Sequence, residues 1–447
     1  NFNLYLFCRI IKKFGKIPFR LKEDASFLNP LDLSETTSLT CSVNIKTINR
    51  NFMLAISKRI PDRFHKIVLC SSGLSFRNNL KLVFSLGQLP FVSPFVSQCR
   101  IPIKKNLRNN IKVPEETDEF ESILNDLVAE QLPISFFEGY LAMRNKSLEV
   151  YPKRTKVILS SNNLTFSPDE GFRFWVANQV EKGAKLIVAQ HGGGYGLFSS
   201  FTEKHELEIS DKFFTWGWGV KRPKASPMAG GKLQSIRHNV RSDPNGGILW
   251  VSTLALLFSV RSDHVSVGCY GLNYISQQER FLKVVCSEVH KLLLMRLPPS
   301  IGNRKRYWNE KERLRDLYPS LKFYRGKDSM IQQLQGCRIC IHDYFGTTWL
   351  ETLSMNFPTV VFWDLNRVHT LASVQPYLDD LRRLKILHDT PESAAEFVNG
   401  IYEDPLLWWM SSELQQVKDK FCQEFARTSK NWLEEWRDEI IKVANQP

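Results

Sequence analysis

Short apolar runs and segments of helical spacing alternate along the chain from about residue 150 onward. Short β-branched apolar runs predict strands, and apolar residues at helical spacing predict amphipathic helices. In the first part of this region we predict strands at residues 156–160, 185–190 and 213–218 and a helix at residues 170–182. Strands that alternate with helices form parallel sheets covered by those helices, so the pattern predicts an α/β fold.

The segment at residues 221–247 interrupts this alternation. It is rich in Pro, Gly and Lys and lacks apolar periodicity, so we predict an interdomain linker there. After it the alternation resumes with a predicted helix at about residues 277–294 and predicted strands at residues 248–257, 321–324, 337–341 and 359–363. The pattern therefore predicts a second parallel sheet.

The end of the chain, residues 405–443, is predicted to be helical and is rich in aromatic residues. The aromatic positions at helical spacing are Trp408, Trp409, Phe421, Phe425, Trp432 and Trp436. An aromatic stripe on one helix face usually packs into a core. We expect these helices to pack across and hold one domain against the other.

The length and composition predict a globular protein with two domains. A chain of 447 residues exceeds what one hydrophobic core usually organises, and a hydrophobic share of 43% excludes a disordered protein. We predict a first Rossmann-like domain with a basic part at residues 1–112 and its remainder at 113–240. The second domain is predicted at residues 248–400, with the returning C-terminal helices at 401–447.

The apolar segments do not indicate export or a membrane span. The longest apolar run, at residues 248–260, is shorter than the roughly 20 residues that a transmembrane helix needs. Near the start of the chain, apolar residues precede Lys12, Lys13 and Lys16, which is the reverse of the order in a signal peptide. We therefore expect a cytoplasmic protein.

The nine cysteines are scattered, and Cys337 and Cys340 form the one CxxC pair. The pair falls on a predicted strand, where it would point to opposite faces, and a second pair of zinc ligands is absent from the sequence. We interpret these residues as core cysteines of a reducing compartment and expect no metal site.

The formal net charge of +14 is concentrated at one end of the chain. Residues 1–112 carry 19 Lys and Arg against 5 Asp and Glu, whereas residues 113–447 carry 41 of each sign. Such a surface favours an anionic partner, either a lipid headgroup layer or a phosphorylated acceptor, but a merely solvated basic face is the more favoured alternative. Nucleic acid is the least favoured partner, because no recognisable nucleic-acid module is present.

The most distinctive motif follows the strand predicted at residues 185–190. It is a glycine-rich turn with a histidine at its mouth, and it reads Gln190-His191-Gly192-Gly193-Gly194-Tyr195-Gly196. Ligands of open α/β sheets collect at the carboxyl ends of strands. Glycines allow close backbone approach and expose N–H groups to an oxyanion or phosphate, and His191 can donate a proton to a leaving phosphate. A tight turn with a satisfied histidine is the structural alternative.

A second motif follows the strand predicted at residues 337–341. It begins at His342 and continues through Gly346, Thr347 and Thr348 to Glu351. Hydroxyls and backbone N–H groups at the start of a helix form a phosphate site. Glu351 can accept the ribose hydroxyls of a nucleotide, or it can complete a capping box with Thr348.

Three further charged residues are weaker candidates. Asp169 and Glu170 stand where a helix is predicted to begin, so they are either caps or the carboxylates that sugar transfer needs near the acceptor. Arg296 follows an apolar run and can neutralise a diphosphate or a sugar carboxylate.

Together these motifs resemble a transferase family found in bacterial O-antigen and surface-polysaccharide gene clusters. The resemblance runs from about residue 150 to about residue 430, and more distantly the family is similar to GT-B glycosyltransferases, including retaining β-Kdo transferases that use CMP-Kdo. The matching residues are residues 190–196, Ser210-Asp211, Thr215-Trp-Gly-Trp218, Thr347-Thr348, Leu350-Glu351, Asn356-Phe-Pro-Thr359, Phe362-Trp363 and Trp408-Trp409.

The resemblance implies two Rossmann-like domains that face a cleft, with the acceptor on the first domain and the nucleotide-sugar donor on the second. It places His342, Thr347, Thr348 and Glu351 on the donor side. It implies that Asp169, Glu170 and His191 face the reacting carbon.

The predicted function is transfer of a sugar from a nucleotide donor to a lipid-linked or saccharide acceptor, at the inner face of the cytoplasmic membrane. No cofactor besides the sugar nucleotide is expected. Two alternatives stay open at this point. One is epimerisation or hydrolysis of a nucleotide sugar on the same fold, and the other is a non-catalytic module that binds anionic surfaces through its basic first quarter.

Overall fold

The computed structural model describes most of the chain after residue 60. The described residues are 10, 60–91, 101–108, 111, 119–161, 164, 169–199, 203–236, 240–253, 255–257, 270–298, 307–326, 328–364 and 368–446. The predicted basic surface at residues 1–112 therefore lies largely outside the described residues. Within these ranges the structure has no helix with the length and apolar character of a membrane span.

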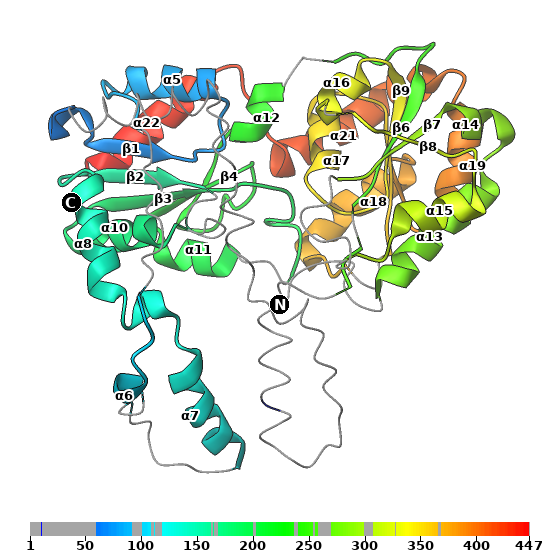
Figure 1. Ribbon diagram of the computed structural model, residues 1–447. Coiled ribbons are helices and arrows are strands. Elements are labelled where there is room, and N and C mark those ends of the chain that lie inside the picture. Colours follow the sequence, from blue (N-terminus) through cyan, green and yellow to red (C-terminus); the bar gives the residue numbers. More distant parts are fainter. Residues whose placement is uncertain are drawn as a thin grey trace. The chain divides into compact units, whose positions relative to one another are not determined.

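The strands form two parallel sheets, as the alternating pattern predicts (Figure 1). The first sheet follows the sequence order, β1-β2-β3-β4-β5, and the second has the order β11-β10-β9-β6-β7-β8. The strands of the first sheet are β1 (Ile67–Cys70), β2 (Val157–Ser160), β3 (Lys185–Ala189), β4 (Lys212–Thr215) and β5 (Ala225–Pro227). The strands of the second are β6 (Gly247–Val251), β7 (Leu293–Arg296), β8 (Lys322–Phe323), β9 (Cys337–His342), β10 (Thr359–Phe362) and β11 (Leu387–His388).

Helices connect these strands, which confirms the α/β class. Those that precede β6 in the described chain are α5 (Phe76–Ser85), α6 (Lys105–Arg108), α7 (Glu119–Gln131), α8 (Tyr140–Val150), α10 (Glu170–Glu181), α11 (Glu203–Ile209) and α12 (Gly231–Ile236). Those that follow it, up to residue 401, are α13 (Tyr270–Val284), α14 (Ser287–Leu292), α15 (Glu310–Leu317), α16 (Met330–Leu334), α17 (Thr348–Ser354), α18 (Gln375–Arg383) and α19 (Pro391–Ile401).

The chain divides into two compact units. The first unit is formed by Asn1–Cys70 and Val83–Lys185, and the second by Ser71–Leu82 and Leu186–Pro447. In the first unit, β1 pairs with β2 in parallel and α8 packs against α10. All four residues of β2 are buried, and Tyr151 stacks on Trp175 at 5.0 Å between ring centroids.

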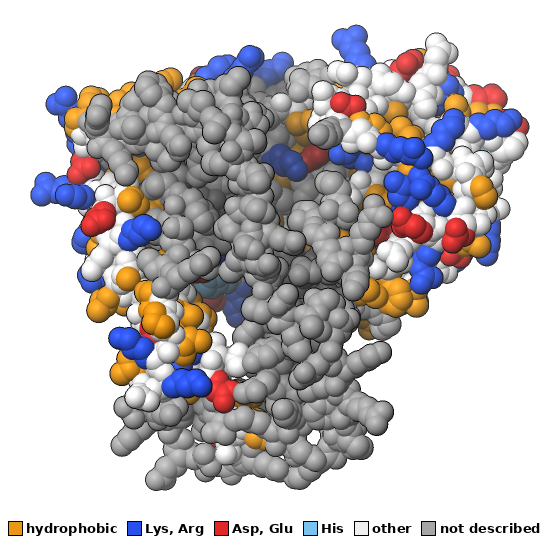
Figure 2. Space-filling model, viewed as in Figure 1, with side chains coloured by type: hydrophobic (Ala, Val, Ile, Leu, Met, Phe, Trp, Pro, Cys, Tyr) orange, Lys and Arg blue, Asp and Glu red, His pale blue; other side chains and the backbone are white. Residues whose placement is uncertain are grey.

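The first unit also carries exposed apolar side chains. Its large hydrophobic residues with more than half of their surface exposed are Phe84, Ile103, Phe136 and Leu141. Figure 2 shows hydrophobic side chains, with Lys and Arg side chains among them, over the region of α6, α7 and α8.

In the second unit, the segment predicted as a linker is partly structured. Ala225–Pro227 forms β5, which pairs with β4, and Gly231–Ile236 forms α12. The prediction of a linker over residues 221–247 is therefore wrong in its middle part. The strand is three residues long and contains a proline, so it has no apolar alternation that could have indicated it.

One face of the second sheet forms a hydrophobic core with neighbouring helices in the second unit. Alternate strand residues such as Trp250, Ile341 and Phe362 belong to one cluster with buried residues of α13, α14, α15 and α19. These helices lie on one side of the second sheet (Figure 1). Phe281 of α13 stacks on Phe362 at 5.2 Å between ring centroids. The other face packs against α17 and α16. The predicted strands at residues 321–324, 337–341 and 359–363 are confirmed as β8, β9 and β10.

The prediction of one helix in the second unit was wrong at the C-terminal end of that helix. The prediction ran a single helix over residues 277–294, whereas α13 ends at Val284, α14 at Leu292, and a strand, β7, begins at Leu293. Leucine has a high helix propensity, but here Leu293 and Met295 are fully buried beside β6, so tertiary packing overrides the propensity.

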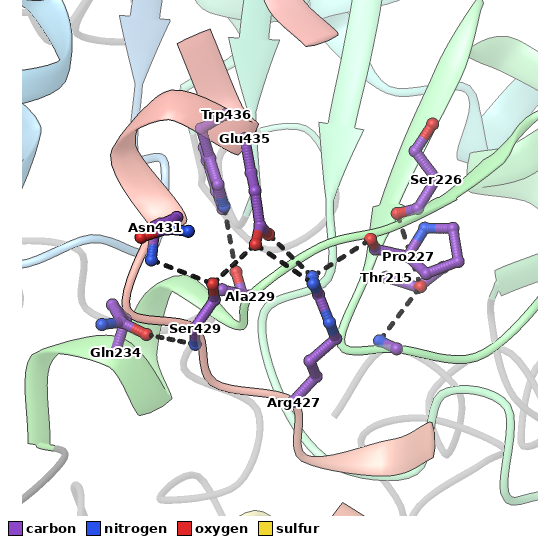
Figure 3. A network of polar contacts seen from close by, with 11 residues as sticks. Thr215, Ser226, Pro227, Ala229, Gln234, Arg427, Ser429, Asn431, Glu435 and Trp436 are labelled. Carbon is purple, nitrogen blue, oxygen red and sulfur yellow. Dashed lines mark hydrogen bonds and ion pairs between the residues drawn. The ribbon is translucent and has the colours of Figure 1, made fainter. Parts of the chain in front are cut away.

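The C-terminal helices contact elements of both sheets within the second unit. They are α20 (Pro405–Trp409), α21 (Ser412–Phe425) and α22 (Trp432–Ala444). α21 packs against α17 and α18, while Trp436 of α22 meets Phe214 of β4 edge-on at 5.2 Å and donates to the Ala229 carbonyl at 3.0 Å (Figure 3). That these helices hold one predicted domain against the other stays a prediction.

Most of the aromatic stripe is core. Trp409, Phe421, Phe425 and Trp436 are buried, whereas Trp408 and Trp432 are half-buried.

The two cysteines of the CxxC pair are buried free thiols. Burial raises the pKa of Cys337 to about 11 and that of Cys340 well above its usual value. Both are therefore protonated, inert core residues at neutral pH, which confirms the core interpretation for this pair.

Candidate functional site

The glycine-rich turn after β3 is held by the side chain of Gln190. This buried amide donates to the Gly192 carbonyl at 2.8 Å, and its oxygen accepts the Trp216 backbone N–H at 2.9 Å and the Trp218 indole N–H at 2.7 Å. All the hydrogen bonds that one amide oxygen can accept are thus used to fix the turn against the end of β4. Sequence reasoning quoted Gln190 as part of the motif but did not assign it this role.

His191 is half-buried and lies against Tyr195. The Tyr195 hydroxyl is 2.7 Å from His191 Nδ1, and the two rings meet edge-on at 5.1 Å between centroids. Tyr195 itself is 1% exposed, so its position is fixed by the core. The contact therefore sets the orientation of the histidine ring.

Two glycines of the turn are required by the backbone. Gly194 and Gly196 have φ values of 97° and 69°, which L residues rarely adopt. At Gly196 a Cβ would also lie 2.6 Å from the Trp218 ring. The Gly196 N–H donates to Glu203 Oε2 at 2.8 Å.

The other two glycines allow the turn to touch the loop after β9. The Gly193 N–H donates to Thr347 Oγ1 at 2.9 Å, and a Cβ on Gly193 would lie 2.7 Å from the Gly346 carbonyl oxygen. A Cβ on Gly192 would lie 3.0 Å from Thr347 Oγ1. The structure thus brings the two sequence motifs together, and it commits the Gly193 N–H to the protein itself.

The residues around Thr348 form a partly buried hydrogen-bonded cluster. The Thr348 hydroxyl lies 2.8 Å from the Tyr344 hydroxyl and 3.3 Å from His342 Nδ1, while His342 Nε2 lies 3.1 Å from Thr352 Oγ1. Burial lowers the pKa of His342 to about 3, so the ring stays neutral at physiological pH. His342 therefore acts as a neutral hydrogen-bonding partner of the Thr348 hydroxyl.

Glu351 forms an ion pair rather than a helix cap. Its Oε1 lies 2.5 Å from Lys232 Nζ, and its side chain is 6% exposed. The N-cap of α17 is Thr347, without a side-chain capping bond, and Thr348 is the first helical residue. The capping box between Thr348 and Glu351 that the sequence allowed is therefore not formed.

Asp343, between the strand and the loop, is the centre of a buried network that sequence reasoning missed. Its carboxylate accepts the Trp250 indole N–H at 3.0 Å, the Ser252 hydroxyl at 2.7 Å, the Tyr274 hydroxyl at 2.6 Å and the Gln278 amide at 2.9 Å. Burial raises the pKa of Asp343 to about 6. The available signal was an acidic residue that directly follows an apolar strand.

The carboxylates predicted on the acceptor side lie in the first unit. Asp169 is 3% exposed, caps α10 by accepting the Phe172 N–H at 3.1 Å, and accepts the Tyr151 hydroxyl at 3.0 Å. Glu170 pairs with Arg173 at 2.7 Å. The capping interpretation of Asp169 is confirmed, and its catalytic role stays a prediction.

Arg296 lies at the end of β7 in the second unit. Its Nη1 donates to the Asp328 carbonyl at 3.0 Å, and its guanidinium stands over the Tyr324 ring at 5.7 Å from the centroid. Among the described residues, no group of three or more His, Cys, Asp or Glu is arranged to hold a metal ion.

Comparison with curated proteins found no match. Among solved structures, a proposed UDP-N-acetylglucosamine 2-epimerase from Listeria monocytogenes has a TM-score of 0.41 at 10% identity, covering 88% of this chain and 93% of that one. MurG of Acinetobacter baumannii has a TM-score of 0.38 at 10% identity, covering 69% and 79%. The wall teichoic acid polymerase TagF has a TM-score of 0.36 at 9% identity, covering 92% and 98%.

The comparison with protein families gives a match over nearly the whole chain. Residues 1–440 match the family described as LIC12162 family transferase. This agrees with the resemblance to a transferase family carried by the motifs after β3 and β9. The chain belongs to the LIC12162 family of transferases.

Proposed function

We propose that this transferase is a glycosyltransferase, which moves a sugar from a nucleotide-sugar donor to a lipid-linked or saccharide acceptor in surface-polysaccharide synthesis. The observation that carries the proposal is the hydrogen bond from the Gly193 N–H to Thr347 Oγ1. It joins the loops that follow β3 and β9, two strands of different parallel sheets. Because ligands of open α/β sheets bind beyond the carboxyl ends of strands, this junction is the favoured place for a donor.

On the donor side we assign Gly346, Thr347, Thr348 and Glu351. Hydroxyls and backbone N–H groups in one short stretch can bind a phosphate, and a carboxylate beside them can accept ribose hydroxyls. The support for this assignment is that His342 and Tyr344 hold the Thr348 hydroxyl, so the group is pre-organised. Arg296, paired with a carbonyl at the end of β7, is the weakest donor candidate.

On the acceptor side we assign His191 as the group that donates a proton or hydrogen bond to the leaving phosphate. Its contact with the buried Tyr195 fixes the ring, which is what an acid catalyst requires. Asp169 or Glu170 would serve as the base or nucleophile for the acceptor hydroxyl. Stabilisation of the leaving phosphate by fixed donors would supply most of the rate enhancement.

We further propose that the protein works in the cytoplasm, at the inner face of the cytoplasmic membrane, without a cofactor besides the sugar nucleotide. The support is the excess of Lys and Arg in residues 1–112, which suits an anionic lipid surface. A CMP-linked donor would indicate a Kdo-like sugar.

Calorimetric titration with CMP, UDP and GDP tests the donor site. We expect one of the three to bind, and Glu351→Ala to weaken that binding on the order of tenfold or more. Glu392→Ala is a matched control, because Glu392 also pairs with a basic residue, Arg280, at 2.5 Å but lies on α19. The assignment is wrong if none of the nucleotides binds or if Glu351→Ala and Glu392→Ala bind alike.

The reaction class is tested with the nucleotide sugar that corresponds to the bound nucleotide. Transfer requires that the donor is consumed only when an acceptor is added. Consumption without acceptor, with release of an isomer or of free sugar, would instead identify an epimerase or a hydrolase.

A further inference from the structure

Lys232 is a half-exposed cation that pairs with Glu351 of α17, the helix that begins at Thr348. It belongs to α12, inside the segment that the sequence marks as a linker. Its side chain is 49% exposed, while the carboxylate it contacts, that of Glu351, is 6% exposed. An ammonium group has three N–H donors, and the structure records one contact of this group, the ion pair with Glu351 at 2.5 Å. The exposed part of the group remains accessible to an anion.

The backbone that presents Lys232 is held in place by the C-terminal segment (Figure 3). The Gly230 N–H donates to the Arg427 carbonyl at 2.8 Å, and Gln234 Oε1 accepts the Ser429 N–H at 3.1 Å. The Arg427 guanidinium is itself fixed by Glu435 at 2.8 Å. Contacts on both sides of Lys232 thus set the position of α12, which makes this a built arrangement rather than a mobile surface lysine.

Lys232 is connected through Glu351 to both candidate loops. The Glu351 backbone N–H donates to the Thr347 carbonyl at 3.2 Å, one helical turn earlier, and Thr347 Oγ1 accepts the Gly193 N–H at 2.9 Å. The buried carboxylate ties the ammonium to α17, the helix that begins at Thr348. A compact cation held at this helix is suited to a phosphate oxygen.

We propose that Lys232 binds a phosphate group of the donor nucleotide and that Glu351 positions it for this contact. The inference rests on the proposed function and deepens it, because it adds to the same site a phosphate-binding residue that lies in neither motif. If Lys232 only stabilised the fold, replacing it would not weaken nucleotide binding more than nucleoside binding. If Lys232 binds a phosphate group, replacing it weakens the binding of the nucleotide and not that of the nucleoside, which has no phosphate.

The test compares Lys232→Gln, Lys232→Arg and the wild type by calorimetric titration. The ligands are the nucleotide that the wild type binds among CMP, UDP and GDP, and the matching nucleoside. We expect Lys232→Gln to weaken nucleotide binding on the order of tenfold to a hundredfold, the range of a charge-assisted hydrogen bond, and nucleoside binding less than about twofold. Lys232→Arg should retain nucleotide binding within about threefold.

Arg280→Gln is the matched control. Arg280 is 47% exposed and pairs with a carboxylate at 2.5 Å, but it lies on α13, so its loss should leave both affinities unchanged. Thermal unfolding of each variant verifies that it is folded. Equal binding of nucleotide by Lys232→Gln and wild type, or equal weakening of nucleotide and nucleoside, overturns the role of Lys232 while the proposed function stands. If the wild type binds none of the three nucleotides, both fall together.

Discussion

Glu310 offers the sharpest quantitative test of the buried chemistry in this protein. It is 2% exposed at the start of α15, where its Oε2 accepts the Ala255 N–H at 2.7 Å. Glu310 Oε1 is buried without a hydrogen-bond partner. A buried carboxylate oxygen without a donor favours the neutral, protonated form of the group.

Burial raises the pKa of Glu310 from 4.5 to about 8, and the nearby Asp343 adds to the shift. The folded protein therefore binds this proton more tightly than the unfolded chain does. The stabilisation is complete below about pH 4.5 and is lost as the pH rises to about 8. With about 1.4 kcal/mol for each unit of pKa, the expected loss between pH 6 and pH 8 is about 2 kcal/mol.

The other titrating groups of the network act mostly outside this window. The pKa of Asp343 is raised from 3.8 to about 6, so its contribution to stability is complete below about pH 3.8 and is largely lost by about pH 6. Burial raises the pKa of Tyr274 well above 10, so its hydroxyl stays protonated throughout. A change of slope between pH 6 and pH 8 can therefore be assigned to Glu310.

The perturbation is Glu310→Gln, whose amide oxygen can still accept the Ala255 N–H and which does not titrate. Urea unfolding followed by tryptophan fluorescence at pH 6, 7 and 8 measures the free energy of unfolding. The variant should gain about 2 kcal/mol relative to wild type on going from pH 6 to pH 8. Glu392→Gln is the control, because the ion pair with Arg280 lowers the pKa of Glu392 and places its titration at acid pH. Parallel pH profiles for wild type and Glu310→Gln would refute the reasoning.

Two packing predictions can be measured by the same unfolding assay. Gly193→Ala places a Cβ 2.7 Å from the Gly346 carbonyl oxygen and should lower the free energy of unfolding by about 1–3 kcal/mol. Gly336→Ala is the control and should leave this free energy unchanged, because no atom lies within 4 Å of the added Cβ. Equal effects of the two substitutions would contradict the contact at Gly193. Trp436→Ala empties a 2% exposed site and should lower it by about 3–5 kcal/mol, clearly more than Trp432→Ala at a half-buried site.

The parts of the fold that the sequence predicted are those fixed by local burial. β2, β9 and β10 are apolar runs bounded by polar residues, and the predicted strands agree with them to within one residue at each end. β5 and β7 escaped prediction because they depend on neighbours distant in the chain. β7 uses leucines that favour helices, and β5 is a short edge strand held beside β4.

In the candidate site, too, the sequence predicted the features that local residues determine and missed those that depend on distant residues. The residues of both motifs could be selected from the sequence, because glycines and threonines directly after apolar strands are informative by themselves. The bond between Gly193 and Thr347 spans 154 positions, so no local pattern indicates it. Lys232 was overlooked for a related reason, since its partner Glu351 is distant in the sequence and its own segment has no apolar periodicity.

The glycines of the turn after β3 show why a motif can be recognised correctly and still be explained incompletely. Close approach of a phosphate group and close approach of a second backbone segment both require a residue without a Cβ atom. From the sequence, Gly193 was expected to make room for a ligand, and in the structure it makes room for Gly346 and Thr347. The two explanations are compatible, because a turn locked to the loop after β9 holds His191 and Thr348 at fixed positions. Such fixed positions are what stabilisation of a leaving phosphate would require.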